Sequence, residues 1–170
     1  MGLFPPSPGG GSEVAHGYKG KGSLLHLLVD RAGNPIAITT TAANGDERKE
    51  VEKLLDQTSL RLPSQSLGGR MVVLEADRGY DCQWLRQALL IRGIFPLISY
   101  RKISGRGSVK TEEVCKLFCL TKTRWVVERA FAWLKRRCRR LLMRWERLPL
   151  IWTGFAKLSL VYTWIKNLVG

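Results

Sequence analysis

Two apolar stretches near the start of the chain predict a β-hairpin. Residues 24–30 read LLHLLVD, an apolar run of strand length, and residues 36–41 read IAITTT, which is rich in β-branched side chains. Between them, Gly33 and Asn34 tolerate the positive φ angles of a tight turn, so the two runs are expected to pair antiparallel. A helix with one narrow apolar face is predicted next, at 44–57.

The middle of the chain has the pattern of a parallel strand pair. Residues 71–76 (MVVLEA) form a short apolar run, typical of a strand that is covered on both faces. A helix is predicted at about 82–92 with Asp81 as its N-cap, and 94–99 (IFPLIS) is a second strand. Strand, helix and strand in succession imply parallel strands joined by a crossover.

Two helices are predicted toward the end of the chain, at about 123–143 and from Pro149 onward. In each, apolar residues recur every three to four positions and mark the face expected to be buried. These residues are Val127, Phe131, Leu134, Cys138 and Leu141 in the first helix, and Ile151, Phe155, Leu158, Tyr162 and Ile165 in the second.

The order of these elements predicts an α/β domain with a mixed sheet flanked by helices. Residues 1–22, rich in Gly, Pro and Lys, are expected to form a flexible loop. The main domain is expected at 23–147, with a basic, irregular connection at 100–122, and 148–170 as a helix packed on the same domain.

The charge of the chain points to a polyanionic partner. Its 170 residues include 28 Lys and Arg against 14 Asp and Glu, a net charge of +14. Nucleic acid is the usual partner of so basic a protein, while a merely basic surface or an anionic membrane surface are the alternatives. The apolar stretch 148–169 carries Lys157 and Lys166, which argues against a membrane span.

The four cysteines, at 82, 115, 119 and 138, form no C-x-x-C motif. Cys115 and Cys119 would need two distant ligands to hold zinc, so free thiols in a reducing cytoplasm are expected. Residues 1–12 lack the apolar core of a signal peptide. We therefore expect a cytoplasmic protein, associated with the nucleoid if it binds DNA.

One acidic residue in each half of the chain is a candidate for chemistry. Asp77 follows the predicted strand 71–76, where open α/β sheets form their sites, although a helix cap or a turn with Gly79 would also explain it. On the helix at 123–143, Arg124, Glu128 and Lys135 lie within about 40° of one another. This row is either the edge of a phosphate-binding cleft or an ordinary salt-bridged surface.

Arginines crowd the end of that helix, at positions 136, 137, 139, 140, 144 and 147, with Trp125, Trp133 and Trp145 among them. Unpaired arginines at this density repel one another, and contact with a DNA backbone would explain them. Most tryptophans at such spacing belong to the core, although an exposed one could stack on an unpaired base.

Two motifs connect these candidates. Residues 77–80 (DRGY) match a D-x-G-[FY] pattern, and residues 124–135 (RWVVERAFAWLK) match R-x3-E-x6-K. With residues 17–47, they resemble bacterial insertion-sequence transposases of the DDE type, in particular families four and five, over nearly the whole chain. The family signature starts with a tyrosine where this chain has Thr121.

The resemblance implies an RNase H-like fold and two-metal phosphoryl transfer on DNA, with Mg²⁺ or Mn²⁺ as cofactor. It implies that Asp77 and Glu128 are catalytic metal ligands. The expected partners are DNA at the transposon ends and target, and a homodimer or a complex with a full-length or first-frame product. The candidate DNA-binding residues are Lys19, Lys21, Arg78, Arg124, Lys135, Arg136, Arg137, Arg139 and Arg140.

The resemblance also implies a third carboxylate on a central first strand, just before a G-x-F segment. Residues 2–4 (GLF) match that segment, so Met1 falls where the aspartate would be. We therefore expect a truncated or second-frame chain that lacks its first central strand, is marginally stable and is inactive alone. Ribosomal frameshifting, a misplaced start codon or decay would each explain this.

Two other functions compete with a transposase. A non-catalytic remnant or regulator of transposition would bind DNA with the same dependence on salt. A basic RNA-binding protein would carry exposed aromatic side chains on a sheet face, and the predicted strands carry almost none.

Overall fold

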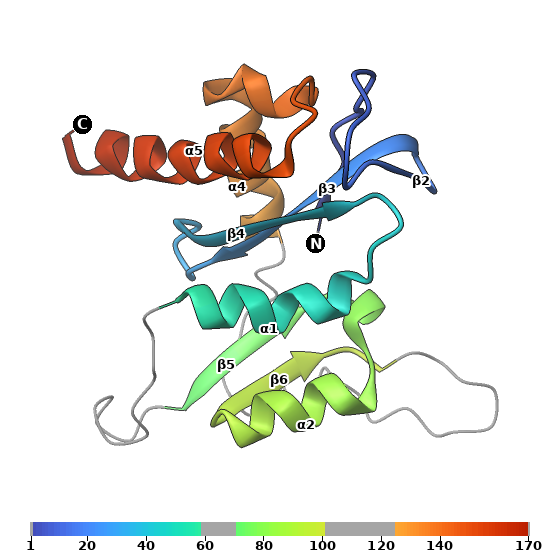
Figure 1. Ribbon diagram of the computed structural model, residues 1–170. Coiled ribbons are helices and arrows are strands. Elements are labelled where there is room, and N and C mark those ends of the chain that lie inside the picture. Colours follow the sequence, from blue (N-terminus) through green and yellow to red (C-terminus); the bar gives the residue numbers. More distant parts are fainter. Residues whose placement is uncertain (1, 59–70, 101–124, 170) are drawn as a thin grey trace. The chain divides into compact units, whose positions relative to one another are not determined.

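The computed structural model describes residues 2–58, 71–100 and 125–169 (Figure 1). These belong to two compact units, each described here by itself: unit 1 is Met1–Thr58 with Val126–Gly170, and unit 2 is Ser59–Trp125. Residues 101–122 of the predicted connection at 100–122 lie outside the described residues, as do Met1, Cys115, Cys119, Thr121 and Arg124.

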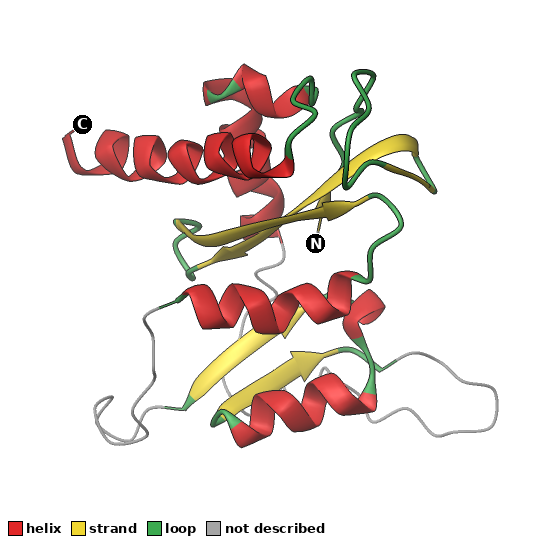
Figure 2. Ribbon diagram, viewed as in Figure 1, coloured by secondary structure: helices red, strands yellow, loops and turns green. Residues whose placement is uncertain are grey.

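Unit 1 is built on an antiparallel sheet whose long strands are β3 (Gly20–Val29) and β4 (Pro35–Ala42) (Figure 2). The predicted hairpin is confirmed, with Leu25 opposite Thr40 in its register. The turn closes because the Asp30 carboxylate accepts hydrogen bonds from the backbone and side-chain amides of Asn34, each at 2.8 Å. Gly33 has φ +93°, which a residue with a side chain rarely adopts.

The prediction that residues 1–22 are only a loop is wrong. Two short strands, β1 (Gly2–Leu3) and β2 (Ala15–Gly17), pair antiparallel with β3. Gly17 lies opposite Gly20, so β2 and β3 form a tight hairpin. The sequence did not predict these strands, because their glycines and prolines break any apolar period. The strands form because pairing with β3 satisfies the hydrogen-bonding groups of their backbones.

Helix α1 (Glu47–Gln57) begins three residues later than the 44–57 prediction. Its N-cap is Asp46, whose side chain accepts a hydrogen bond from the Arg48 amide at 3.0 Å. The Arg48 guanidinium also donates to Asp46, and this hydrogen bond lowers the pKa of the Asp46 carboxyl. The helix therefore starts where an acid satisfies its free amides.

The predicted long helix at 123–143 is interrupted. Helix α4 spans Trp125–Arg137, Cys138 leaves the helical conformation with φ −122° and ψ 76°, and a 3₁₀ helix, η2, covers Arg139–Leu142. The main core joins buried residues of the sheet to these helices and to α5 (Pro149–Val169). It consists of Leu25, Leu27, Ile38, Ala130, Phe131, Leu134, Leu141, Trp152 and Ala156.

The predicted buried stripe of the last helix is wrong by one position. The buried residues of α5 are Trp152, Ala156, Ser159 and Thr163, while the predicted stripe is exposed. The helix packs on β4, where the Thr40 and Thr153 hydroxyls lie 2.7 Å apart and the Trp164 indole donates to the Pro35 carbonyl. Small side chains on this face let the helix axis come close to the sheet.

Unit 2 confirms the predicted strand, helix and strand. Strands β5 (Val72–Ala76) and β6 (Ile94–Ile98) pair in parallel, with helix α2 (Gln83–Ile91) between them in the chain. The molecule is thus of mixed α/β class, with an antiparallel sheet in one unit and a parallel pair in the other. One mixed sheet that joins the two stays a prediction.

Candidate metal and nucleic-acid site

Asp77 lies directly after the last residue of β5, at the carboxyl end of the parallel pair. It is the N-cap of a 3₁₀ turn, η1 (Arg78–Tyr80), and one of its carboxylate oxygens accepts a hydrogen bond from the Arg78 amide at 2.7 Å. Asp77, Arg78 and Gly79 are exposed, whereas Tyr80 is buried and fixes the turn. A carboxylate has about four acceptor positions, so this cap is compatible with metal binding.

The predicted role of Asp81 as the cap of α2 is wrong. Cys82 is the N-cap and makes no side-chain capping bond. Asp81 instead forms an ion pair with Arg86, at 2.9 Å from Nη2, and the same Nη2 donates to the Ile98 carbonyl at 2.6 Å. This pair ties the segment after β5 to the end of β6 and so supports the turn that carries Asp77.

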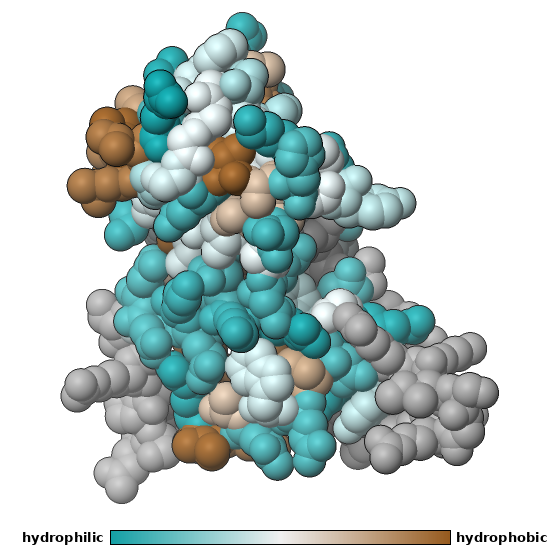
Figure 3. Space-filling model, turned by 45° about the vertical axis from the view of Figure 1, so that its right-hand side comes forward, coloured by the Kyte–Doolittle hydropathy of each residue, from teal (hydrophilic) through white to brown (hydrophobic). Residues whose placement is uncertain are grey.

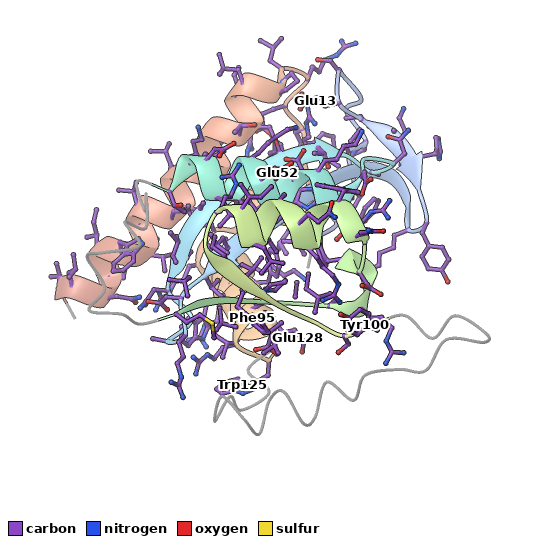
Figure 4. All side chains as sticks on the ribbon, turned by 90° about the horizontal axis from the view of Figure 1, so that it is seen from below. Glu13, Glu52, Phe95, Tyr100, Trp125 and Glu128 are labelled. Atoms are coloured by element: carbon purple, nitrogen blue, oxygen red, sulfur yellow. The ribbon has the colours of Figure 1, made fainter. Side chains whose placement is uncertain are left out.

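Sequence reasoning missed Arg86, because a separation of five residues between acid and base is not a helical pairing pattern. The Arg86 guanidinium also lies over the ring of Tyr100, at 4.0 Å from its centroid. Tyr100 stands just past the end of β6 in Figure 4. The end of the parallel pair is therefore held by an ion pair, a carbonyl hydrogen bond and a cation–π contact.

Glu128 projects from the first turn of α4 and is exposed (Figure 4). Val126 and Ala130, on the opposite face of the helix, are buried, so Glu128 faces away from that part of the core. Within the described residues, Glu128 has no hydrogen-bond or ion-pair partner, so the salt-bridged row is not seen between Glu128 and Lys135. Lys135, two turns further along the helix, is half-buried.

Asp77 belongs to unit 2 and Glu128 to unit 1, so the convergence of the two carboxylates stays a prediction. Among the residues that the structure describes, no group of three or more His, Cys, Asp and Glu side chains could hold a metal ion. Cys82 and Cys138 are free thiols, and burial raises the pKa of Cys138.

The arginines after α4 differ from one another in their surroundings. Arg136 and Arg139 are exposed, and their contact with DNA stays a prediction. Arg137 lies 5.8 Å from the ring centroid of Trp133 and keeps its exposure. Arg140 is exposed but donates to the Glu146 carboxylate at 2.7 Å, so part of its charge is neutralised.

Arg144 was expected to contact DNA, and this expectation is wrong because the residue is fully buried. Its guanidinium donates to the carbonyls of Ser12, Glu13 and Glu146 at 2.8, 3.1 and 2.9 Å, and to the Ser23 hydroxyl at 2.7 Å. Glu13, labelled in Figure 4, has φ 59°, a conformation that is unusual for a residue other than Gly. Arg144 thus fixes the loop that leads into β2.

The tip of the β2–β3 hairpin presents the predicted DNA-binding residues Lys19 and Lys21, which are both exposed. Tyr18 lies beside Lys19 at the tip and is fully exposed. The sequence reasoning did not single out Tyr18. The signal was available, because two residues between paired glycines form a two-residue turn that points its side chains into solvent.

The structure describes no helix that is long and apolar enough to cross a membrane, within its three described segments. The chain is thus an α/β protein with a basic surface and an exposed aspartate at the end of a parallel strand pair. Residues 5–164 match the model of the transposase DDE domain family, and the chain belongs to this family.

A similar protein supports the same family. The chain is 39% identical over 143 residues to a protein of Burkholderia cepacia named as the transposase of insertion sequence element IS402. The match covers 81% of this chain and 60% of that protein, so the chain spans less than two thirds of its relative. No solved structure matches the chain.

Proposed function

We propose that this chain forms the catalytic part of a DDE transposase with an RNase H-like fold, which cleaves and joins DNA strands at the ends of an insertion sequence. The match of residues 5–164 to the transposase DDE domain carries the proposal. The exposed Asp77 at the end of β5 supports it, because sites of open α/β sheets lie outside the carboxyl ends of their strands.

Asp77 and Glu128 are the proposed ligands of Mg²⁺ or Mn²⁺, two ions in the complete enzyme. Their donor chemistry fits, since both side chains are exposed carboxylates and these hard cations prefer oxygen ligands. When bound, the metals supply polarisation of the scissile phosphate and stabilisation of the leaving oxygen. The buried Tyr80 and the Asp81–Arg86 pair keep the Asp77 turn in place.

The basic residues are proposed to hold the DNA backbone. Arg78 stands next to Asp77 and would contact a phosphate near the cut, while Lys19 and Lys21 would grip DNA from the hairpin. Arg140, already paired with Glu146, is expected to contribute least. The remaining proposed contacts are Arg124, Lys135, Arg136, Arg137 and Arg139.

This proposal places the chain with the DNA of the nucleoid, in the cytoplasm. The alternative, a DNA-binding regulator without catalysis, keeps the basic contacts but requires no metal at Asp77 and Glu128. The absence of activity in the isolated chain stays a prediction. One experiment on metal binding and DNA cleavage separates these possibilities.

The experiment measures Mn²⁺ binding by electron paramagnetic resonance and nicking of a supercoiled plasmid. We expect Asp77→Asn and Glu128→Gln each to weaken Mn²⁺ binding at least about tenfold, since each removes one charged ligand. Asp56→Asn, an exposed acid on α1, is the matched control and should bind Mn²⁺ like the unmodified chain. Unchanged Mn²⁺ binding in both variants, with full DNA affinity, would favour the regulator.

A further inference from the structure

The tip of the β2–β3 hairpin exposes one aromatic residue, Tyr18. It occupies the turn between Gly17 and Gly20 and is 104% exposed, as open to water as in an isolated peptide. Among the described residues 2–58, Tyr18 is the one large hydrophobic residue that is exposed. A single exposed aromatic residue is common on protein surfaces, so its surroundings decide what it can bind.

The surroundings of Tyr18 are basic and polar. Lys19 shares the turn, Lys21 lies opposite His16 on the paired strands, and all three are exposed. No acidic residue occurs at positions 14–29, and within the part of the chain that the structure describes neither lysine has an ion-pair partner. Figure 3, which brings the right-hand side of Figure 1 forward, shows that hydrophilic side chains predominate on the described part of this face. The positive charge beside Tyr18 is therefore available to an anionic ligand.

The hairpin below this turn is held firmly on unit 1. A Cβ on Gly17 would collide with the Ala43 carbonyl, so β2 packs directly against that part of the backbone. The Ser7 amide donates to the Lys21 carbonyl at 3.3 Å, and Arg144 binds the loop that leads into β2. A tyrosine has only two side-chain torsions, so an aromatic ring on a fixed hairpin loses little conformational freedom when it binds a ligand.

We propose that Tyr18 stacks on an unpaired DNA base while Lys19 and Lys21 bind the phosphates beside it, a role that depends on the DNA binding proposed above. Binding sites for unpaired nucleic acid combine aromatic rings, on which bases stack, with basic residues that follow the backbone. The core of a protein–protein interface, in contrast, is depleted in lysine. The composition of the hairpin tip thus favours nucleic acid over a protein partner.

Stacking on Tyr18 requires DNA in which a base is unpaired. In an intact duplex the neighbouring base pairs cover both faces of every internal base, so the tyrosine ring finds no free face there. A bulged or frayed strand exposes such a face, and every base has one, so the contact tolerates any sequence. Tyr18 therefore gives the chain a preference for distorted DNA, whereas the lysines bind the phosphates of paired and unpaired DNA alike.

The test compares two labelled DNA duplexes with the same sequence and the same ends, one of which carries two extra unpaired thymines at its centre. Binding of the full chain is measured by fluorescence anisotropy without divalent metal, so that the DNA is not cleaved. We expect the unmodified chain to bind the bulged duplex at least about fivefold more tightly, as stacking on one base implies. Tyr18→Ala should lose this preference and keep its affinity for the paired duplex, whereas Tyr18→Phe, which retains the ring, should keep the preference.

Two control variants separate stacking from other effects. Tyr162→Ala removes an exposed tyrosine from α5 and should keep the preference for the bulged duplex. Lys19→Ala should weaken the binding of both duplexes alike and lower the salt slope by about one. Tyr18→Ala should leave the salt slope unchanged, because it removes no charge.

Equal binding of both duplexes by the unmodified chain, or a preference that persists in Tyr18→Ala, would overturn the role of Tyr18 and leave the DNA binding of the chain intact. An equal loss of preference in Tyr18→Phe and Tyr18→Ala would assign the contact to the hydroxyl group and refute stacking. Absence of binding to either duplex would contradict the proposed function, and the stacking of Tyr18 with it.

Discussion

Replacing Arg144 with Met is expected to destabilise unit 1 by about 3 kcal/mol. The variant keeps an apolar stem of similar length and removes the guanidinium, which makes four hydrogen bonds in a fully buried position. Three carbonyls and one hydroxyl then lose a charged donor. Such bonds are each worth roughly 1.5–3 kcal/mol, and an unpaired buried group costs roughly 1–3 kcal/mol.

The full sum of these terms overestimates the loss. Burial of the guanidinium lowers the pKa of Arg144, opposed by Glu13 and Glu146, which shows that the native protein already bears a desolvation cost. The Met variant no longer bears it, and water can reach part of the vacated space. The net loss of stability that remains for Arg144→Met is close to the roughly 3–5 kcal/mol that follows removal of one partner from a buried charged network.

The assay is urea denaturation followed by far-ultraviolet circular dichroism. With a slope of about 2 kcal/mol per molar urea, the loss lowers the midpoint by roughly 1.5 M. Arg147→Met removes the same charge from an exposed side chain and should change stability by less than about 0.5 kcal/mol. An Arg144→Met variant whose stability lies within about 1 kcal/mol of the unmodified chain would refute a structural role for the guanidinium, and so would equal destabilisation of the two variants.

Three other features of the structure can be tested in the same way. Gly11→Ala should lower the melting temperature, because Gly11 has φ +111° and a Cβ there would collide with the Arg147 carbonyl. Gly154→Ala is the contrasting variant: Gly154 lies inside α5 with open space around its Cβ position, so this change should raise stability by up to about 1 kcal/mol. Burial lowers the pKa of His26, with Glu47 and Glu50 opposing, so the unfolded chain takes up a proton near pH 6.5 and the folded chain only at lower pH. Stability should therefore fall as the pH drops below about 6.5, and melting curves of His26→Gln should lose this component; an unchanged pH profile would contradict it. Lys19→Ala and Lys21→Ala should each reduce the salt slope of DNA binding, measured by fluorescence anisotropy, by about one, and an unaltered slope would exclude both lysines from the phosphate contacts.

Much of the local structure could be predicted from the sequence. The hairpin β3–β4 followed from two β-branched or apolar runs around Gly33 and Asn34, and the parallel pair followed from an apolar run, a helical period and a second run. These signals are local, since each depends on residues within one element or its turn. The acids expected at a site, Asp77 and Glu128, were likewise found from their places relative to these elements, although their meeting stays a prediction.

Contacts between segments far apart in the chain could not be predicted from the sequence. Arg144 resembled the basic residues around it, and only the carbonyls of Ser12 and Glu13, over 130 positions away in the chain, explain its burial. The Asp81 side chain could cap α2 or pair with Arg86, and the Ile98 carbonyl beside Arg86 favours the pair. Each outcome depends on a partner whose position no local pattern specifies.

Helix α5 separates what the sequence predicts from what the tertiary packing determines. The sequence alone determined a helix from Pro149 with an apolar stripe, because hydrophobic residues recur there every three to four positions. It did not determine which face meets the sheet. Trp152, Ala156 and Ser159 are the residues that face the sheet, because small side chains beside one tryptophan let the helix approach β4 closely. The more hydrophobic stripe is exposed on the surface.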